Sequence, residues 1–445
     1  HAGQKRLNGE SIIDHCLGTA YYLAKIKMDD ATIIGGLLHE SIDEGGCTPQ
    51  QIRKEFGDDI AQLVEGVSNL GRLKYRGIER YAENVRKVFI SMGSDIRIIL
   101  IKFADRLHNL ATLHVLPREK QERIAREVLE IYAPIADRLG IGYFRRELED
   151  LAFKYVDPET YESIVSVIQP KYEQKQGYLE HVKTVIQKDL AEKGITVVRL
   201  ESRLKSIHST HSKMQKKRSD SVAGIYDLIA MRIIVPSIAD CYAALGIVHQ
   251  RWHPLPGRIK DYISQPKENN YRALHTTVVC EEGEIVEFQI QDPDMYKEAR
   301  FGIAAHWHYS ESHKVSQKIM KNIEWLKELM RLQETAENDE EYVKSLKLDV
   351  FRDRIFVFTP KGDVIHMPDG ATPIDFAYYI HSDIGRKCSG ARINDSFASL
   401  DTPLKSGDVV EILVEKNRKR PSVDWLSIAK THLALAKIKV QLKEE

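Results

Sequence analysis

The chain has little of what marks membrane or disulfide-stabilised proteins. Its 445 residues contain no apolar run long enough to span a bilayer, and the best, Ile-Arg-Ile-Ile-Leu-Ile at 96–101, is short and interrupted by charge. Cysteine is scarce: the five residues are odd in number and form no Cys-x-x-Cys pair, which favours free thiols in a reducing compartment. No signal peptide is found. We therefore expect a cytoplasmic protein with no membrane partner.

The chain also lacks an excess of charge. Lys and Arg together number 65, as do Asp and Glu, so there is no global basic field and any site for a polyanion must be local. The length allows about three domains. The chain starts at His1 without Met and stops inside a helical run, so we expect it to be part of a longer protein.

Hydrophobic spacing predicts five successive regions. Apolar residues three and four apart favour helices at the start, and strands alternate with helices from about residue 198. In the β-rich part that follows, a hairpin should turn at 360–363 and a helix should begin at Pro373. The regions are an all-α unit at 1–155, a helical connector at 156–200, a mixed unit at 201–346 ending in a charged helix near 315–346, a compact β-rich unit at 351–414, and the start of a helical region at 415–445.

A polar cluster interrupts the first helical region. We predict a helix over Ala31–Glu44, stopped by the two glycines that follow. His39 and Asp43 are four residues apart, as are Glu40 and Glu44, so both pairs would project from one helix face. Taken alone, this pattern also fits a solvated polar face.

Two further polar residues extend this cluster. His15 lies on the preceding predicted helix, and Asp105 lies on a later one, in Lys-Phe-Ala-Asp-Arg-Leu-His-Asn. Two imidazoles and two carboxylates form a mixed nitrogen and oxygen set that suits an ion such as Mn²⁺. A water bound to that ion would be a nucleophile at neutral pH.

A second polar set lies in the mixed region. Asp227 opens an apolar run that contains Arg232, and the segment 286–291 alternates so that Glu287, Gln289 and Gln291 share one face. Two acids able to hold a divalent cation, surrounded by Arg and Lys, suit the handling of polyphosphate. An amphipathic sheet with solvated charges is the simpler alternative.

Upstream, a cationic stripe accompanies these acids. Lys205, Ser209 and Lys213 recur at every fourth residue and can follow a phosphate chain, although such a stripe is often a solvated helix face. Tyr271 offers a surface on which a base can stack.

The ordered combination of these segments resembles the synthetase domain of the RelA/SpoT homologues, the (p)ppGpp synthetases and hydrolases. The segments are Arg203–Met214, Gly257–Ile263, Asn269–Thr277 and Val286–Gln291. The resemblance extends over nearly the whole chain. It implies a multidomain α+β fold: an all-α HD-type hydrolase domain, a mixed α/β nucleotidyltransferase-like synthetase domain and a β-grasp TGS domain.

In the HD-type domain the resemblance implies hydrolysis of (p)ppGpp at a Mn²⁺ site. Two departures stand out: Glu40 replaces an Asp, and the family's Glu-Asp order is reversed at Asp43 and Glu44. The implied metal ligands are His15, His39, Glu40 and Asp105, the catalytic acidic pair is Asp43 and Glu44, and the guanine-nucleotide contacts are Arg6 and Asn109.

In the synthetase domain the resemblance implies transfer of pyrophosphate from ATP to the 3′-OH of GDP or GTP, with Mg²⁺. Glu287 would be the base. The implied residues are Arg203 and Arg232 beside adenine; Lys205, Ser209 and Lys213 on the ATP phosphates; Asp227 and Glu287 at Mg²⁺; Tyr271, His275 and Gln289 in the guanine pocket; and Arg258 and Lys260 in a basic motif typical of bifunctional members. Four positions depart from the family, namely His208, Asn270, Gln291 and Arg300.

The last unit resembles a TGS domain. His381 matches a position that meets deacylated tRNA on the ribosome in the family, so tRNA and the ribosome are implied partners. Two alternatives stay open. One is a synthetase whose helical domain is only regulatory, and the other is a non-enzymatic sensor of nucleotides and tRNA.

Overall fold

The computed structural model describes residues 3–71, 77–217, 229–267, 269–309, 354–415 and 417–443. The chain divides into two compact units, residues 1–72 with 90–322 and residues 73–89 with 323–445. In the part of the chain that is described, no helix is both long and apolar enough to cross a bilayer.

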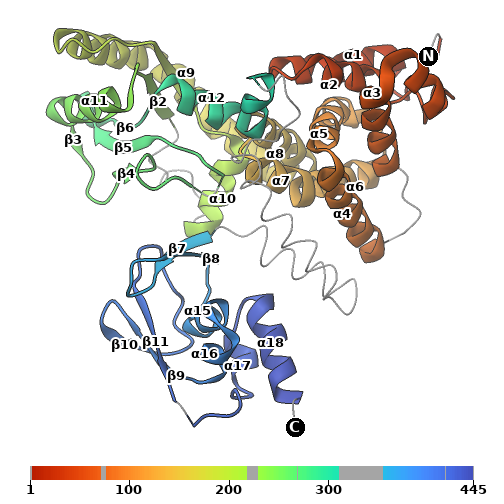
Figure 1. The fold of residues 1–445 in the computed structure, drawn as a ribbon. Helices are drawn as coiled ribbons and strands as arrows, with labels where there is room; N and C mark the ends of the chain where they lie inside the picture. The colour runs from red at the N-terminus through yellow and green to blue at the C-terminus, as the bar shows by residue number, and fades with distance from the viewer. Residues whose placement is uncertain are drawn as a thin grey trace. The chain divides into compact units, whose positions relative to one another are not determined.

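The first region is helical, as predicted (Figure 1). Three of its helices begin at standard N-cap residues, because the side chains of Ser11, Asp29 and Asp95 each accept a hydrogen bond from a backbone N–H of the first turn. The elements are α1 (Ile12–Lys25), α2 (Asp30–Leu38), α3 (Pro49–Gly71), α4 (Gly77–Ser94), α5 (Ile96–Ala111), η1 (Leu113–Val115), α6 (Arg118–Glu127), η2 (Val128–Tyr132), α7 (Ala133–Arg138) and α8 (Gly142–Val156).

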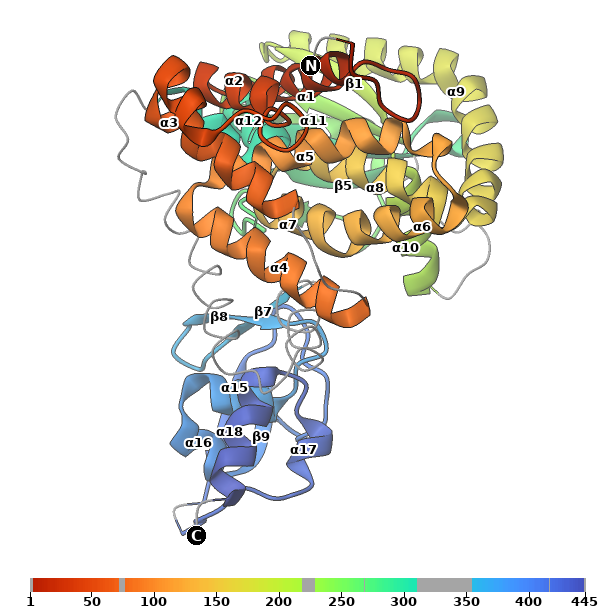
Figure 2. The same ribbon diagram turned by 90° about the vertical axis from the view of Figure 1, so that its right-hand side faces the viewer.

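Helix α5 is the centre of this region. Most of its residues are buried, and it contacts α1, α2, α3 and α8, as Figure 2 shows for α1 and α8. Arg97 at its start donates to Asp59 of α3 at 2.9 Å and to Asp95 at 2.7 Å, which ties two helices through a nearly buried cation.

The predicted helix 31–44 is shorter than expected. Helix α2 ends at Leu38, and residues 39–44 form turns. Competing hydrogen bonds explain the early end, because Ser41 N donates to the Leu38 carbonyl at 2.9 Å and the His39 ring donates to the Gly36 carbonyl at 2.8 Å. The four-residue spacing of His39 and Asp43 therefore does not place them on one helix face.

A mixed sheet forms the rest of the first unit. Its strand order is β1-β2-β6-β5-β3, with β4 also paired to β5, and β2 and β6 run parallel while the other pairs are antiparallel. The elements are α9 (Pro158–Glu192), β1 (Arg199–Leu204), α10 (Ile207–Lys217), β2 (Ile229–Ile234), α11 (Ile238–Arg251), β3 (His253–Pro254), β4 (Lys260–Asp261), β5 (Leu274–Val279), η4 (Glu281–Gly283), β6 (Ile285–Gln291), α12 (Pro293–Phe301) and η5 (Gly302–Tyr309).

The two faces of this sheet differ as the alternation in β6 predicts. Val286, Phe288 and Ile290 are buried in one hydrophobic core with residues of α9 and α11. Glu287 and Gln289 point to the opposite face. Because two helices cover the apolar face, the polar face is the one available for a site (Figure 1).

In its described residues beyond 353, the second unit contains two small sheets and four helices. The predicted hairpin is confirmed, since β7 and β8 pair and Thr359 N bonds to the Asp363 carbonyl at 2.9 Å. The elements are β7 (Arg354–Phe358), β8 (Val364–Pro368), α15 (Pro373–Ile380), α16 (Ser382–Arg386), β9 (Cys388–Ile393), β10 (Ser396–Ala398), β11 (Val410–Val414), α17 (Trp425–Ile428) and α18 (His432–Lys443). The charged helix predicted near 315–346 lies outside the described residues.

A buried carboxylate holds this unit together. Asp375, 1% exposed, accepts from Thr372 N at 2.8 Å at the start of α15 and from Thr431 N at 2.8 Å before α18. These bonds lie where the helical region predicted at 415–445 is broken into α17 and α18. The break lets the backbone N–H groups of Lys430 and Thr431 turn toward Asp375.

Candidate functional site

Four residues predicted as metal ligands lie together in the helical region. His15 comes from α1, His39 is the C-terminal cap of α2, Glu40 follows it, and Asp105 lies in α5. One donor atom from each of the four lies within 4.8 Å of the other three. His15, His39 and Asp105 are buried, and Glu40 is partly exposed.

The spacing of these atoms fits a shared cation. The His15 and His39 Nε2 atoms are 3.1 Å apart, and His15 Nε2 lies 3.4 Å from Asp105 Oδ1. Glu40 Oε1 lies 3.7 Å from His15 Nε2 and 3.6 Å from His39 Nε2. Donors bound at about 2.1 Å lie roughly 3.0 to 3.4 Å apart in octahedral or tetrahedral geometry. Small movements would bring all four to one ion, and the longer Glu40 side chain reaches the site.

His39 and Asp105 are already prepared as ligands. The His39 Nδ1–H group donates to the Gly36 carbonyl at 2.8 Å, which leaves Nε2 with its lone pair, and burial lowers the pKa of His39. Burial alone would raise the pKa of Asp105, but Lys102 at 2.7 Å and the hydrogen bond from His15 outweigh it and hold that pKa well below its usual value. The pair is therefore one neutral imidazole and one carboxylate at neutral pH.

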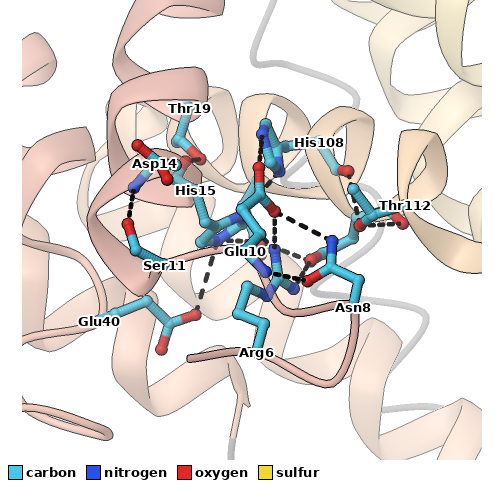
Figure 3. Close-up of polar contacts among 12 residues, drawn as sticks. Arg6, Asn8, Glu10, Ser11, Asp14, His15, Thr19, Glu40, His108 and Thr112 are labelled. Carbon is cyan, nitrogen blue, oxygen red and sulfur yellow. Dashed lines mark hydrogen bonds and ion pairs between the residues drawn. The ribbon is translucent and has the colours of Figure 1, made fainter. Parts of the chain in front are cut away.

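The two predicted nucleotide contacts adjoin this cluster. Arg6 Nη2 donates to Asn109 Oδ1, whose amide in turn donates to Asp105 at 2.6 Å. Arg6 Nη1 also donates to His15 Nδ1 at 2.7 Å (Figure 3). The residues expected to bind guanine nucleotide are thus bonded directly to the expected metal ligands.

The predicted acidic pair, Asp43 and Glu44, lies outside the ligand cluster. Asp43 and Glu44 are exposed, and neither belongs to the group of four that lie within 4.8 Å of one another in the described chain. Asp43 accepts from Ser68 of α3 at 2.7 Å. The helical spacing that linked this pair to His39 and Glu40 was wrong, because α2 ends before them.

On the polar face of the sheet, a chain of side-chain contacts crosses four strands. Arg232 of β2 donates to Glu201 of β1 at 2.9 Å and to Gln289 of β6 at 3.4 Å. Gln289 donates to Glu287 at 3.0 Å. Beyond it, Glu287 Oε1 lies 3.4 Å from His275 Nδ1 of β5. The strand register places Arg232, Gln289 and His275 directly opposite one another.

Burial sets the charge of this face. The Tyr271 hydroxyl lies 2.8 Å from His275 Nε2, and burial raises the pKa of Tyr271 to about 12 while it lowers that of His275. Burial, with the guanidinium groups of Arg232 and Arg146, lowers the pKa of Arg203 to about 10. Cations forced together in this way are stabilised by an anion such as a phosphate.

The other predicted residues lie on further elements of this region or outside the described residues. Ser209 and Lys213 lie in α10, and Lys205 lies in the link before it, so the predicted stripe is only partly helical. Arg258 and Lys260 are exposed, and Lys260 of β4 pairs with His275 in the sheet register. Asp227 lies outside the described residues.

The departures from the family pattern have local contacts. Asn270 adopts φ 59°, a region that Asn tolerates better than other non-glycine residues. Gln291 is fully buried and donates to the Arg272 carbonyl at 2.7 Å. Arg300 donates to the Tyr296 hydroxyl at 3.0 Å, and His208 lies 3.7 Å from Glu149.

The sequence did not reveal some of the residues at the ligand cluster and on the polar face of the sheet. Lys102 and His108 contact the ligand cluster, and their spacing of three residues on either side of Asp105 on one helix was the available signal. On the sheet, Tyr262 lies edge-on to His275 with ring centroids 5.2 Å apart, and Lys267 lies 4.8 Å from the Tyr262 ring centroid. Those contacts depend on loop conformation, which local sequence patterns do not predict.

Three family descriptions match the chain in succession. They are an HD domain at residues 1–142, a region found in RelA / SpoT proteins at 202–314, and a TGS domain at 355–414. The chain is thus an HD-type helical domain followed by a RelA/SpoT-type mixed domain and a TGS domain.

Relatives match over the full chain. A GTP pyrophosphokinase of Myxococcus xanthus is 42% identical over 100% of this chain and 59% of its own length. The bifunctional (p)ppGpp synthase/hydrolase SpoT of Escherichia coli is 42% identical over 100% of this chain and 63% of its own length. The chain therefore belongs to the RelA/SpoT family, and it spans 59% and 63% of these two relatives.

Among solved structures, the small alarmone synthetase 1 of Bacillus subtilis bound to pppGpp is 20% identical, with a TM-score of 0.28 over 40% of this chain and 95% of that chain.

Proposed function

We propose that the chain is a cytoplasmic alarmone enzyme with two active sites. It transfers pyrophosphate from ATP to the 3′-OH of GDP or GTP, giving (p)ppGpp and AMP, and it hydrolyses (p)ppGpp to GDP or GTP and pyrophosphate. The observation that carries the proposal is that one chain holds both the four-residue donor cluster and the polar chain of contacts on the sheet. The relatives, a GTP pyrophosphokinase and a bifunctional (p)ppGpp synthase/hydrolase, support both activities.

In the proposed synthesis, Glu287 is the base. It accepts the proton of the ribose 3′-OH, whose oxygen forms a bond to the ATP β-phosphorus while the bond to the α,β-bridging oxygen breaks and AMP leaves. His275, 3.4 Å from Glu287 and kept neutral by burial, orients that carboxylate. Tyr271 stacks on guanine, and the cations collected on the sheet stabilise the charge that develops. We propose that Asp227 and Glu287 hold Mg²⁺. The remaining nucleotide contacts are those that the family resemblance implies for the synthetase domain.

In the proposed hydrolysis, His15, His39, Glu40 and Asp105 hold a divalent ion, for which we propose Mn²⁺. That ion would lower the pKa of water and polarise the phosphate. Arg6 and Asn109 bind the guanine nucleotide beside the ligand cluster, to which both are hydrogen-bonded. Asp43 and Glu44 are proposed to assist proton transfer after a local rearrangement of the turn that carries them.

One observation favours a narrower function. Asp43 and Glu44 are exposed on a turn, and the group of neighbouring donor atoms does not include them. If they never approach the site, the helical domain binds metal and nucleotide without hydrolysis, and the chain is a synthetase alone.

The proposed domains are the hydrolase at 1–155, the connector at 156–200, the synthetase at 201–346, the TGS domain at 351–414 and a helical region from 415. For the TGS domain we propose contact with deacylated tRNA on the ribosome through His381. This residue is exposed and accepts from Asp383 N at 3.1 Å, at the start of α16. Its ring is therefore accessible to a partner.

Paired variants test the synthesis. Glu287→Gln should reduce formation of (p)ppGpp by about 10²–10⁴-fold, the range of a general base, with nucleotide binding retained. Glu284→Gln, on the turn before the same strand and paired with Lys175, is the matched control and should synthesise at the wild-type rate. Equal activity in both variants would remove Glu287 from the mechanism.

A further inference from the structure

We propose that His108, supported by Glu10, is a positioning residue that sets the proton on His15 so that His15 can bind the metal. The inference rests on the proposed hydrolase site and deepens it. His108 lies in α5, one turn after Asp105, and its Nδ1 lies 3.0 Å from His15 Nδ1. Figure 3 shows His108, Glu10 and Arg6 around the His15 ring.

The two imidazoles of the site differ in their proton arrangement. His39 donates from Nδ1 to a carbonyl, so its Nε2 is ready as a ligand. His15 also faces the cluster with Nε2, but its Nδ1 lies 2.7 Å from Arg6 Nη1. A guanidinium group only donates, so His15 Nδ1 accepts in this contact. A neutral imidazole then carries its proton on Nε2, and that nitrogen cannot bind a cation.

Metal binding by His15 therefore requires the proton on Nδ1 and an acceptor for it. Arg6 cannot be that acceptor. His108 Nδ1 can accept at its present distance of 3.0 Å, and the ring planes meet at 73°. His108 then carries its own proton on Nε2, which lies 3.5 Å from Glu10 Oε1. The chain Glu10–His108–His15 thus orients a ligand in the way that carboxylate and histidine pairs do in metal sites.

The absence of a side chain at Gly18 leaves space for the His108 ring. A Cβ at Gly18 of α1 would lie 2.1 Å from the His108 ring, so only glycine at this position lets the ring approach α1. Glu10 is placed by its own contacts, since Asn8 Nδ2 donates to it at 3.2 Å. His108 is therefore held against His15 from two sides.

The arrangement couples the metal to Arg6. When His15 Nδ1 carries the proton, Arg6 loses its acceptor on that ring and keeps its bond to Asn109. The Arg6 Nη1 group, which also lies 4.0 Å from Glu10 Oε2, can then turn to a phosphate or base. Metal and nucleotide would thus favour each other through the single proton of His15.

Metal affinity of the full chain tests this proposal. We would titrate Mn²⁺ by calorimetry into the wild type, His108→Ala and His108→Asn. Loss of the acceptor should weaken Mn²⁺ binding by about 10–100-fold, and Asn, whose Oδ1 can accept in place of Nδ1, should restore it to within a few-fold. His114→Ala, which removes an exposed histidine just beyond α5, is the matched control.

A second readout follows the proton itself. In ¹⁵N spectra of labelled histidine, His15 should change from the Nε2–H to the Nδ1–H form on addition of Zn²⁺, a diamagnetic probe. Wild-type affinity in His108→Ala, or equal weakening in both His108 variants, would overturn the acceptor role. If His108→Ala does not fold, the Mn²⁺ affinity of His108→Asn and the ¹⁵N spectra of the wild type still test whether His108 accepts the His15 proton. If the wild type binds Mn²⁺ no better than His15→Ala does, the proposed metal site itself fails.

Discussion

Removing Lys102 should make the stability of the helical domain depend on metal. Its ammonium group lies 2.7 Å from Asp105 Oδ2, and the two side chains are 9% and 3% exposed. In Lys102→Met the buried Asp105 carboxylate loses its countercharge. Breaking one partner of a buried ion pair costs about 3–5 kcal/mol in the free energy of unfolding, so the variant should be destabilised by that amount at pH 7 without metal.

Metal and acid should each reduce this loss. A cation bound by Asp105 replaces the missing charge, so saturating Mn²⁺ should stabilise the variant more than the wild type. Asp105 has a lowered pKa in the folded wild type, so its contribution is present above the ordinary carboxyl pKa of about 4 and is lost as pH falls below it. The difference between wild type and variant should therefore persist from neutral pH down to about pH 4 and shrink as the pH falls further.

Hydrogen exchange of the α5 amides is the suitable assay, because a chain with two compact units has no single unfolding free energy. Lys120→Met, which changes an exposed lysine of α6, is the control and should shift α5 exchange by less than about 0.5 kcal/mol. A loss in Lys102→Met that is independent of both Mn²⁺ and pH would show that Lys102 acts by packing alone and not as the countercharge of Asp105.

Three further substitutions test other parts of the account. Asp375→Asn should destabilise the second unit by about 3 kcal/mol, because an amide cannot accept at both former oxygen positions; a urea transition shifted by less than 1 kcal/mol would contradict this role. Gly302→Ala should cost about 1–3 kcal/mol, since φ is 54° and the new Cβ would lie 2.3 Å from the Leu139 carbonyl; an unchanged melting temperature would argue against this close approach. Burial raises the pKa of Asp150 to about 6, so its ionisation destabilises the fold above that pH and not below about 4. Asp150→Asn should therefore be more stable than the wild type by about 1–3 kcal/mol at pH 7.5, with the gain disappearing toward pH 4, and a gain constant with pH would exclude this cause.

Much of the fold was predictable because it depends on local patterns. The alternation in 286–291 correctly predicted which side of β6 is buried, and Pro373 marked the start of α15. The end of α2 was not predictable from periodicity. There, hydrogen bonds from His39 and Ser41 to carbonyls of the preceding turn end the helix six residues before the expected stop at Glu44.

Site residues were predictable where a polar side chain interrupts an apolar helix. They were not predictable where the role of a residue depends only on contacts with residues distant in the sequence. His15 and Asp105 stood out as polar residues in apolar helices, and the structure brings them within 3.4 Å. Glu201 and Tyr262 looked ordinary in sequence, because their roles arise from strand register and loop packing over long separations. The same limit applies to His108, whose contact with His15 spans 93 residues.

Product analysis of single-site variants decides whether one chain carries two separate active sites. The wild type, Glu287→Gln and His39→Ala would each be incubated with ATP and labelled GDP, and separately with ppGpp and Mn²⁺, followed by chromatography. We predict that Glu287→Gln loses only the synthesis of ppGpp and AMP, and that His39→Ala loses only the release of pyrophosphate from ppGpp. Loss of both activities in either variant, or no product from the wild type in either reaction, would contradict the account.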